Sequence, residues 1–184
     1  MSFTQKKRGS LIARSYEKWG VAHKKVLDVG CGNGVVSKVL METLHLDLFG
    51  TDILDYRKEK IPFRKMEPSR LPFENLAFDY VLFNDCLHHC EQIEALLLEG
   101  KRVGKQLLIF EVKAGPLFRF FDVVLNSFYH SGMPHPKNFK SSEEWCALFD
   151  RLGFDYEKGE VAHPLWYPFR HMAFKLTARE RISL

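Results

Sequence analysis

Short apolar runs and amphipathic stretches alternate along this chain. The runs typical of buried strands occupy residues 26–29, 46–51, 61–66, 78–83 and 106–112. Apolar positions recur at helical spacing over 35–44 and 93–103, and a leading helix is predicted over 10–19. Strands that alternate with helices form a parallel sheet with right-handed crossovers. The pattern therefore predicts an α/β fold with a mostly parallel sheet.

The last third of the chain is less regular. Ser141 or Ser142, followed by Glu144, has the spacing of a helix capping box, so a helix is predicted from there to about Gly153. The runs 154–161 and 169–176 are expected to pair as a closing hairpin. The aromatic stretch 117–129 could line an apolar pocket or pack in the core, and the sequence leaves both open.

Composition limits the class of protein. A chain of 184 residues fits one domain, and 46% hydrophobic with 27% charged residues is ordinary globular composition. No apolar run approaches the roughly 20 residues of a membrane span, so no integral membrane association is expected. The first residues lack the apolar core of a secretory signal. The four cysteines show no disulfide framework, which favours a reducing, cytoplasmic location.

Basic residues are concentrated at the start of the chain. Residues 1–25 hold seven Lys and Arg side chains and one acidic residue, Glu17. We therefore treat residues 1–24 as a basic N-terminal arm and helix at the start of one domain, 1–184. Such an arm can bind nucleic acid or anionic lipid, although basic segments are more often simply solvated.

Three glycines follow the first apolar run. In KVLDVGCGNG, Gly30, Gly32 and Gly34 stand between a strand and a helix N-terminus, where backbone N–H groups are free to meet a ligand. A dinucleotide fingerprint requires glycine where Val35 stands, and the Gly-Lys-Ser/Thr of a P-loop is absent. The carboxylate of Asp28 suits a positively charged ligand. The stretch therefore predicts a nucleoside-cofactor site that is neither a dinucleotide fingerprint nor a P-loop.

A second acidic residue supports this prediction. Asp52 ends the second apolar run, about 20 residues after the glycines, where a carboxylate accepts hydrogen bonds from ribose hydroxyls. This position does not separate a nicotinamide cofactor from S-adenosylmethionine.

The motif Asp-x-Gly-x-Gly-x-Gly resembles the first motif of class I S-adenosylmethionine-dependent methyltransferases. Further along, the chain resembles the quinone-biosynthesis-like (type 11) small-molecule methyltransferases in the stretches Glu67-Pro68-Ser69-Arg70-Leu71-Pro72-Phe73, Phe78-Asp79-Tyr80-Val81 and Leu87-His88-His89. The resemblance, which covers about 26–112, implies a Rossmann-like three-layer sandwich with a seven-stranded, mostly parallel sheet and an antiparallel last strand. It also implies an enzyme that transfers a methyl group from S-adenosylmethionine to a small-molecule acceptor by in-line displacement, releasing S-adenosylhomocysteine.

The same resemblance implies a set of cofactor-binding residues. Glu67 stands where the family usually has an aspartate that contacts the adenine amino group, and its longer side chain and the following Pro68 are departures. In the family a leading helix often folds over the cofactor, which would bring Tyr16 and Trp19 near it. The expected cofactor-binding residues are Asp28, Gly30, Cys31, Gly32, Gly34, Asp52, Ile53, Glu67, Pro68 and Asn84.

Methyl transfer from a sulfonium can be accelerated by alignment and desolvation, so a protein base is optional. Where the acceptor must lose a proton, histidine is suitable, and His88 is the candidate catalytic residue, with Asp85 and His89 behind it. Capping of a helix or core packing is the alternative role for these histidines. Cys86, His89 and Cys90 share a helical face, but no second ligand pair accompanies them, and no metal is expected.

Two other functions remain open from the sequence. The basic residues 1–25 are compatible with an RNA methyltransferase, although Asn84-Asp85-Cys86-Leu87 lacks the Asn/Asp-Pro-Pro-aromatic stretch of many base-amine methyltransferases. A non-catalytic S-adenosylmethionine-binding protein is the other alternative. The expected partner is a small-molecule acceptor, apolar or aromatic, with nucleic acid as the rival, and the oligomeric state stays open.

Overall fold

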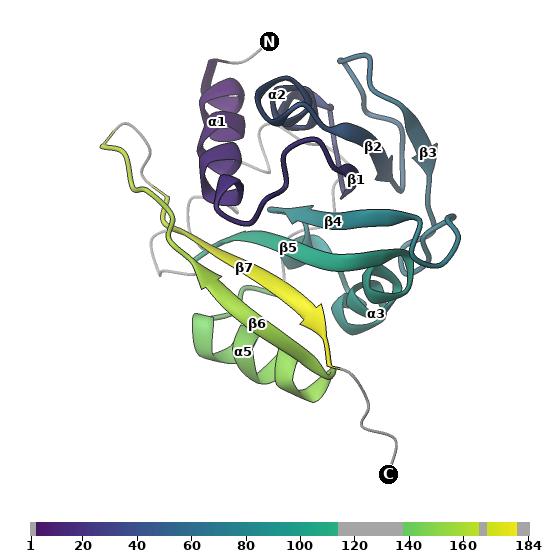
Figure 1. Cartoon of the computed structure of the whole chain (residues 1–184), viewed down its shortest axis with the longest axis vertical. Helices are drawn as coiled ribbons and strands as arrows, with labels where there is room; N and C mark the ends of the chain where they lie inside the picture. Colours follow the sequence, from purple (N-terminus) through teal and green to yellow (C-terminus); the bar gives the residue numbers. More distant parts are fainter. Residues whose placement is uncertain (1–2, 114–137, 166–168, 180–184) are drawn as a thin grey trace.

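The computed structural model describes residues 3–113, 138–165 and 169–179. Its centre is a seven-stranded sheet with the order β3-β2-β1-β4-β5-β7-β6 (Figure 1). The strands are β1 (Lys25–Val29), β2 (Asp47–Asp52), β3 (Phe63–Lys65), β4 (Phe78–Asn84), β5 (Gly104–Val112), β6 (Phe154–Gly159) and β7 (His171–Ala178). Strands β1 to β5 pair in parallel, and β7 is antiparallel to both β5 and β6. The predicted fold class is confirmed.

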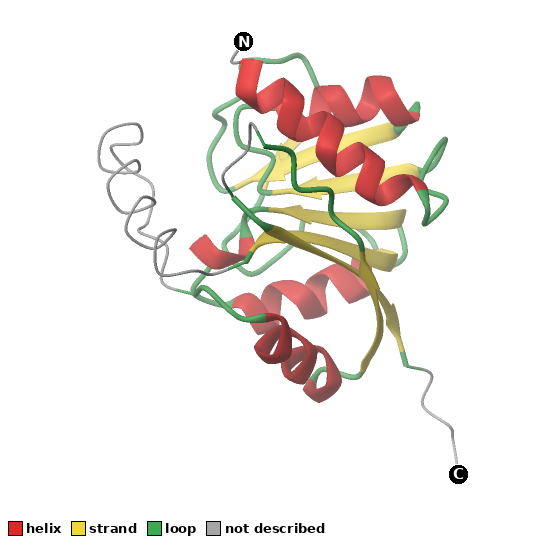
Figure 2. Ribbon diagram, turned by 90° about the vertical axis from the view of Figure 1, so that its left-hand side faces the viewer, coloured by secondary structure: helices red, strands yellow, loops and turns green. Residues whose placement is uncertain are grey.

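Helices cover both faces of the sheet, which gives three layers (Figure 2). The helices are α1 (Phe3–Glu17), α2 (Val35–Leu44), α3 (Ile93–Val103) and α5 (Ser142–Arg151), with a short 3-10 helix at Leu87–His89. Alternate strand residues point to opposite faces. Those on one face pack with α1 and α2, as Leu82 does with Tyr16, and those on the other pack with α3 and α5, as Phe83 does with Leu97.

The element boundaries follow the hydrophobic pattern closely in the first two thirds of the chain. Helices α2 and α3 have the predicted bounds, and the closing hairpin of β6 and β7 forms as expected. The predicted run 61–66 is a strand only over Phe63–Lys65, an edge strand that pairs with β2 alone among the described strands. The leading helix begins at Phe3 rather than near Ser10, and ahead of Ser10 it already contacts distant segments through Arg8, which pairs with Asp85, and Gly9, which packs on Val39.

The predicted capping box is present at the start of α5. The Ser141 hydroxyl accepts a hydrogen bond from the backbone N–H of Glu144 at 3.2 Å, and the Glu144 carboxylate accepts one from the N–H of Ser141 at 2.7 Å. Two N-terminal N–H groups that the helix itself leaves open are thereby satisfied. The helix then presents Trp145 and Phe149 to the core.

One of the sequence-based expectations falls on a part of the chain that is not described. The aromatic stretch 117–129, for which pocket and core were both open, lies outside the described residues. Within the described residues, no helix is long and apolar enough to cross a membrane.

Helices α1 and α2 approach each other closely at Gly9. A Cβ atom added at Gly9 would lie 2.8 Å from the Cβ of Val39 on α2, which is closer than real carbon contacts. Val39 is β-branched and its Cβ is fixed to the helix backbone, so it cannot move aside cheaply. The missing side chain at Gly9 therefore sets the distance between the two helices.

We expect Gly9→Ala to lower the free energy of unfolding by about 1 to 2 kcal/mol, because overpacking outweighs the better helix propensity of alanine. The matched control is Ser10→Ala at the next, exposed position, which should leave stability unchanged or slightly raised. Urea unfolding of both variants measures the difference. An alanine at residue 9 that stabilises the protein would contradict this packing of α1 on α2.

Candidate functional site

The glycine turn after β1 has positive φ angles, which glycine adopts without strain. Gly30, Gly32 and Gly34 have φ angles of 71°, 53° and 76°. A Cβ atom at Gly30 would lie 2.6 Å from the Cβ of Cys86, whereas one at Gly32 would meet no atom within 4 Å. Gly30 is thus required by packing inside the protein, and the backbone at Gly32 faces open space that a ligand can occupy.

Asp52 ties the end of β2 to this turn. Its carboxylate accepts a hydrogen bond from the N–H of Gly32 at 2.9 Å and another from the N–H of Ile53 at 2.7 Å. Burial raises the pKa of Asp52 above its ordinary value, and the backbone N–H donors oppose the shift. The side chain is still partly exposed, so its remaining lone pairs can accept hydrogen bonds from a ligand.

Cys31 fills the inner side of the turn. The N–H groups of Gly30 and Cys31 both donate to the carbonyl of Thr51, at 2.8 and 3.2 Å. A Cβ atom at Gly50 of β2 would lie 2.9 Å from the Cys31 sulfur, so this thiol packs directly on the strand. Burial raises the pKa of the Cys31 thiol far above its usual range, which makes it a packing group and not a nucleophile.

Asp28 is buried and fully engaged by protein donors. The Ser37 hydroxyl of α2 donates to one carboxylate oxygen at 2.6 Å, and the Asn84 side-chain amide of β4 donates to the other at 3.0 Å. Burial raises the pKa of Asp28 to about 6, although both hydrogen bonds favour the ionised form. The sequence suggested that Asp28 faces a cationic ligand; its contacts in the described structure are with Ser37 and Asn84.

The network continues into α1. The Tyr16 hydroxyl donates to the side-chain carbonyl of Asn84 at 2.8 Å, and burial raises the pKa of Tyr16, which keeps it a neutral donor. The Trp19 side chain points toward β6, where its indole N–H donates to Glu157 at 2.7 Å. Of the two aromatic residues expected near the cofactor, Tyr16 contacts a predicted site residue and Trp19 contacts the edge strand.

Glu67 and Pro68 are exposed and follow β3. The N–H of Met66 donates to the carbonyl of Asp52 at 2.9 Å, so the segment leaves β3 beside the glycine turn. Glu67 forms an isolated bridge with Arg70. Its side chain is at the surface of the described structure.

Helix α3 anchors the Leu71-Pro72-Phe73 stretch that follows. The Arg102 guanidinium donates to the carbonyl of Leu71 at 2.9 Å and to that of Phe73 at 2.8 Å. Glu99 pairs with Arg102 at 2.7 Å and accepts the N–H of Leu71 at 2.9 Å. The Leu71-Pro72-Phe73 stretch after Glu67 is therefore held in place by Glu99 and Arg102, two side chains of α3.

Asp85 lies just beyond β4 in a left-handed conformation, with φ of 49°. Its carboxylate pairs with Arg8 of α1 at 2.9 Å and with His171 of β7 at 3.2 Å. Burial alone would raise the pKa of Asp85, but the charges of Arg8 and His171 outweigh it and hold the pKa well below its usual value. Arg8, from the basic N-terminal segment, is thus bound within the fold beside the carboxyl end of β4.

His88 is buried beside Glu111, the penultimate residue of β5. The Nδ1 atom of His88 lies 2.6 Å from one Glu111 carboxylate oxygen, and the other oxygen accepts the N–H of Leu87 at 2.7 Å. Only 5% of His88 and 1% of Glu111 is exposed. Glu111 has no role predicted from the sequence; its signal there is that it is a lone acidic residue near the end of an otherwise apolar strand.

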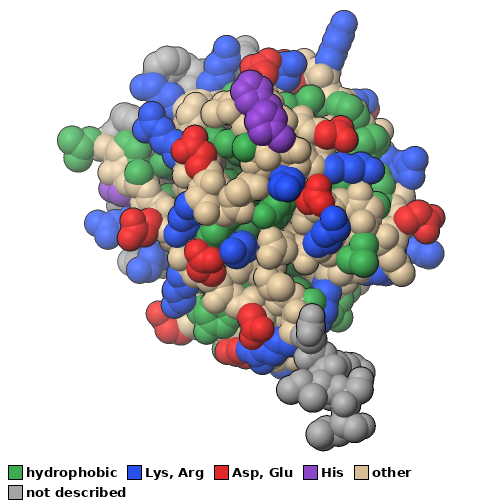
Figure 3. All heavy atoms as spheres, viewed as in Figure 1, with side chains coloured by type: hydrophobic (Ala, Val, Ile, Leu, Met, Phe, Trp, Pro, Cys, Tyr) green, Lys and Arg blue, Asp and Glu red, His purple; other side chains and the backbone are tan. Residues whose placement is uncertain are grey.

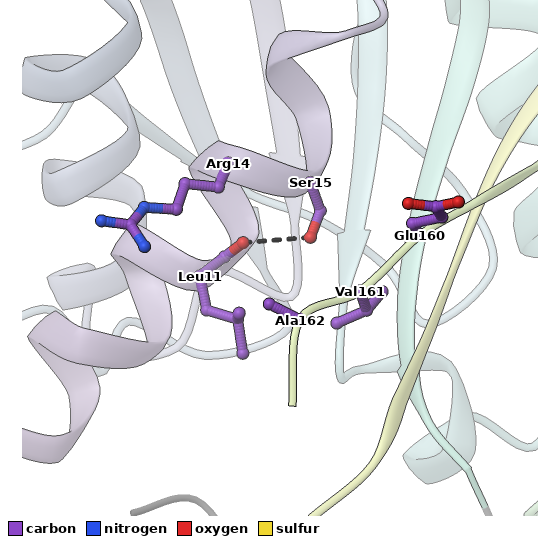
Figure 4. A pocket seen from close by; sticks show the side chains of 6 residues that line it. All are labelled: Leu11, Arg14, Ser15, Glu160, Val161 and Ala162. Atoms are coloured by element: carbon purple, nitrogen blue, oxygen red, sulfur yellow. Dashed lines mark hydrogen bonds between the residues drawn. The ribbon is translucent and has the colours of Figure 1, made fainter. Parts of the chain in front are cut away.

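A small cavity of about 300 Å³ lies between α1 and the segment after β6 (Figure 4). Ser15 donates to the carbonyl of Leu11 at 3.0 Å on one wall, and Arg14 and Glu160 stand on opposite sides. None of the predicted site residues lines this cavity. In the described ranges 3–113, 138–165 and 169–179, no group of three or more His, Cys, Asp or Glu side chains could hold a metal ion.

Part of the chain is similar to a known protein family. Residues 27–109 match a family model described as a methyltransferase domain, and this segment contains the glycine turn, Asp52, Glu67 and His88. The matched segment of the chain is thus similar to a methyltransferase domain, in agreement with the resemblance drawn from the sequence.

Two curated relatives show moderate similarity. The chain is 28% identical over 123 residues to the sterol 24-C-methyltransferase of Schizosaccharomyces pombe, covering 60% of this chain and 30% of that protein. It is 28% identical over 110 residues to the malonyl-[acyl-carrier protein] O-methyltransferase of Legionella pneumophila, covering 54% of this chain and 39% of that protein. The chain thus spans about a third of the length of these relatives.

Solved structures share the fold. An S-adenosylmethionine-dependent methyltransferase from Aquifex aeolicus aligns with a TM-score of 0.65 and 20% identity, covering 90% of this chain and 87% of that one. The 1,6-didemethyltoxoflavin-N1-methyltransferase of Burkholderia thailandensis, solved with 1,6-didemethyltoxoflavin and S-adenosylhomocysteine, aligns with a TM-score of 0.64 and 16% identity, covering 96% and 79%. At these identities the likeness establishes the fold.

The buried Asp28 carboxyl should give stability a distinct pH dependence. In the unfolded chain it titrates near 3.8 and in the folded protein near 6, so between these values the native state binds more protons. The contribution of Asp28 to stability is therefore present at low pH and is lost as the pH rises through 6.

Relative to Asp28→Asn, the wild-type protein should gain up to about 3 kcal/mol as the pH falls from about 7 to about 4. Urea unfolding of both proteins across this range measures the difference, and titrations common to both proteins cancel. Parallel stability curves would show that Asp28 does not hold its proton in the folded state.

Proposed function

We propose that this chain transfers a methyl group from S-adenosylmethionine to a small-molecule acceptor, at the edge formed by the carboxyl ends of β1, β2, β4 and β5. The observation that carries the proposal is the turn at Gly32, where the backbone is open on one side and is fixed by Asp52 on the other. Ligands of open α/β sheets gather at such an edge.

The residues present fit the cofactor. When bound, S-adenosylmethionine supplies a methyl group already activated by its sulfonium charge. We assign the open backbone at Gly32 to its close approach, with Gly30 and Gly34 shaping the turn. We assign the remaining lone pairs of Asp52 to the ribose hydroxyls and Glu67 to the adenine end. We assign Cys31, Ile53, Pro68 and Asn84 to the walls of the same site. Asp28 acts through Asn84 and Ser37, whose positions it fixes.

An acceptor of small-molecule type is supported by the relatives. The names of the similar proteins specify a sterol, a malonyl group on a carrier protein and 1,6-didemethyltoxoflavin, which differ widely in structure. Since function depends on the site and not on the fold, the acceptor of this chain follows from its own residues. We propose His88 as the group that takes a proton from the acceptor.

The alternative of RNA methylation has less support. Arg8 pairs with Asp85 at 2.9 Å, and Lys18 lies 3.9 Å from Glu157, so part of the basic segment is neutralised within the fold. On the face shown in Figure 3, basic and acidic side chains are interspersed and form no single-sign patch. Nucleic-acid binding depends on such a patch.

We also propose that the chain forms one domain that works in the cytoplasm. All four cysteines are free thiols, and the two on either side of the 3-10 helix, Cys86 and Cys90, are not bonded to each other. Free thiols persist in a reducing compartment. The basic segment 1–24 belongs to the same unit in this proposal, because α1 packs on α2.

Calorimetric titration tests the cofactor site. The wild-type protein should bind S-adenosylmethionine and S-adenosylhomocysteine but not NAD. Asp52→Asn should weaken both by roughly 10- to 100-fold, because a charge-assisted hydrogen bond is lost and the turn at Gly32 is loosened. Asp47→Asn, at the exposed opposite end of β2, is the matched control and should bind as the wild type does. Absence of binding by the wild type, or equal affinity in both variants, would contradict the proposed site.

A further inference from the structure

The partner of His88 is Glu111, an acidic residue in the interior of the sheet. Glu111 lies in β5, with β4 on one side and β7 on the other, and only 1% of it is exposed. A buried carboxylate is costly unless its oxygens accept hydrogen bonds. Here one oxygen takes the N–H of Leu87 at 2.7 Å and the other lies 2.6 Å from Nδ1 of His88. Both contacts come from the short 3-10 helix that follows β4.

These contacts determine which ring nitrogen carries the proton. An ionised carboxylate can only accept hydrogen bonds, so the Nδ1 of His88 must be the donor. In the neutral ring the other nitrogen, Nε2, then holds the lone pair. The ring of His88 also stacks on Phe139, with ring centroids 5.2 Å apart, and the tilted ring of His89 lies 4.1 Å away.

We infer that Glu111 is a positioning residue that holds His88 in the Nδ1–H tautomer, so that Nε2 accepts the proton of a methyl acceptor carrying an O–H or N–H group. The inference rests on the proposed function and narrows its acceptor class. As the acceptor oxygen or nitrogen forms its bond to the methyl carbon, the carbon–sulfur bond breaks, and its electron pair goes to sulfur. The acceptor proton moves to Nε2 of His88, which leaves an imidazolium beside the Glu111 carboxylate.

A base at His88 assists the methylation of some acceptors and not of others. A hydroxyl or a ring N–H is a weak nucleophile until it loses its proton, so a base assists its methylation. A carboxylate already ionised at neutral pH needs no such help. We therefore assign the acceptor to the class of phenols, enols and N–H heteroaromatic compounds.

The substitution Glu111→Gln separates positioning from mere packing. The N–H of Leu87 requires an oxygen acceptor, so the glutamine carbonyl must face it, and the glutamine NH₂ then faces Nδ1 of His88. Because that NH₂ donates, Nδ1 must become the acceptor and the proton moves to Nε2. The side chain keeps its size, but the ring changes tautomer.

Ring ¹⁵N NMR of histidine-labelled protein measures the tautomer without cofactor or acceptor, and His88→Asn identifies the signals. We expect Nδ1–H in the wild type, Nε2–H in E111Q, and the wild-type pattern in the control Glu42→Gln on exposed α2. Nε2–H in the wild type, or an unchanged tautomer in folded E111Q, would overturn the inference. Should E111Q not fold, the wild-type tautomer decides alone.

Turnover supplies the second measurement. With a panel of phenols and N–H heteroaromatics as acceptors, E111Q should lower kcat about 100-fold while leaving KM and the affinity for S-adenosylmethionine unchanged. Wild-type turnover restricted to acceptors without a labile proton, or an E111Q variant as fast as the wild type, would contradict the role of Glu111. Lack of S-adenosylmethionine binding by the wild type would instead count against the proposed function, since the tautomer is measured separately.

Discussion

The carboxylate of Asp28 imposes the constraint on which the cofactor edge depends. It lies at the centre of the sheet with 2% of its surface exposed, where an unsatisfied charge would be very costly. Its donors, Ser37 and Asn84, come from α2 and β4, and Tyr16 extends the network to α1. One buried group thereby fixes four elements relative to one another. The glycine turn begins two residues later, so this network also fixes the position from which the turn starts.

The polar groups of the site divide between the two faces of the sheet. Asp28 and Asn84 point toward the layer of α1 and α2, whereas Glu111 lies with the residues that face α3 and α5. This division follows from the alternation of side chains along a strand. On the proposed function, the first network holds the cofactor turn and the second orients the group that acts on the acceptor. The methyl group would then pass between two separately stabilised halves of the edge.

Patterns that repeat along the chain could be predicted, and contacts between distant residues could not. The strand and helix order, the glycine turn and the capping box at Ser141 follow from local spacing, and the fold class was predicted from them together with the family resemblance. The pairing of His88 with Glu111 joins residues 23 positions apart, and that of Tyr16 with Asn84 joins residues 68 apart. Neither pair leaves a periodic signal. The early start of α1 was also missed, and the contacts of Arg8 and Gly9 with Asp85 and Val39 likewise leave no local pattern.

Helix α1 is the first element of the chain, but its contacts are completed by the last ones. Trp19, just past its end, is hydrogen-bonded to Glu157, 138 positions later, and covers Gly159 so closely that a Cβ atom there would lie 2.7 Å from the indole. Most of the described chain separates this helix from β6 and β7. Contacts of such separation slow folding and leave apolar surface exposed in the meantime. The contacts of Trp19 with β6 are thus among the last that the folding chain can form.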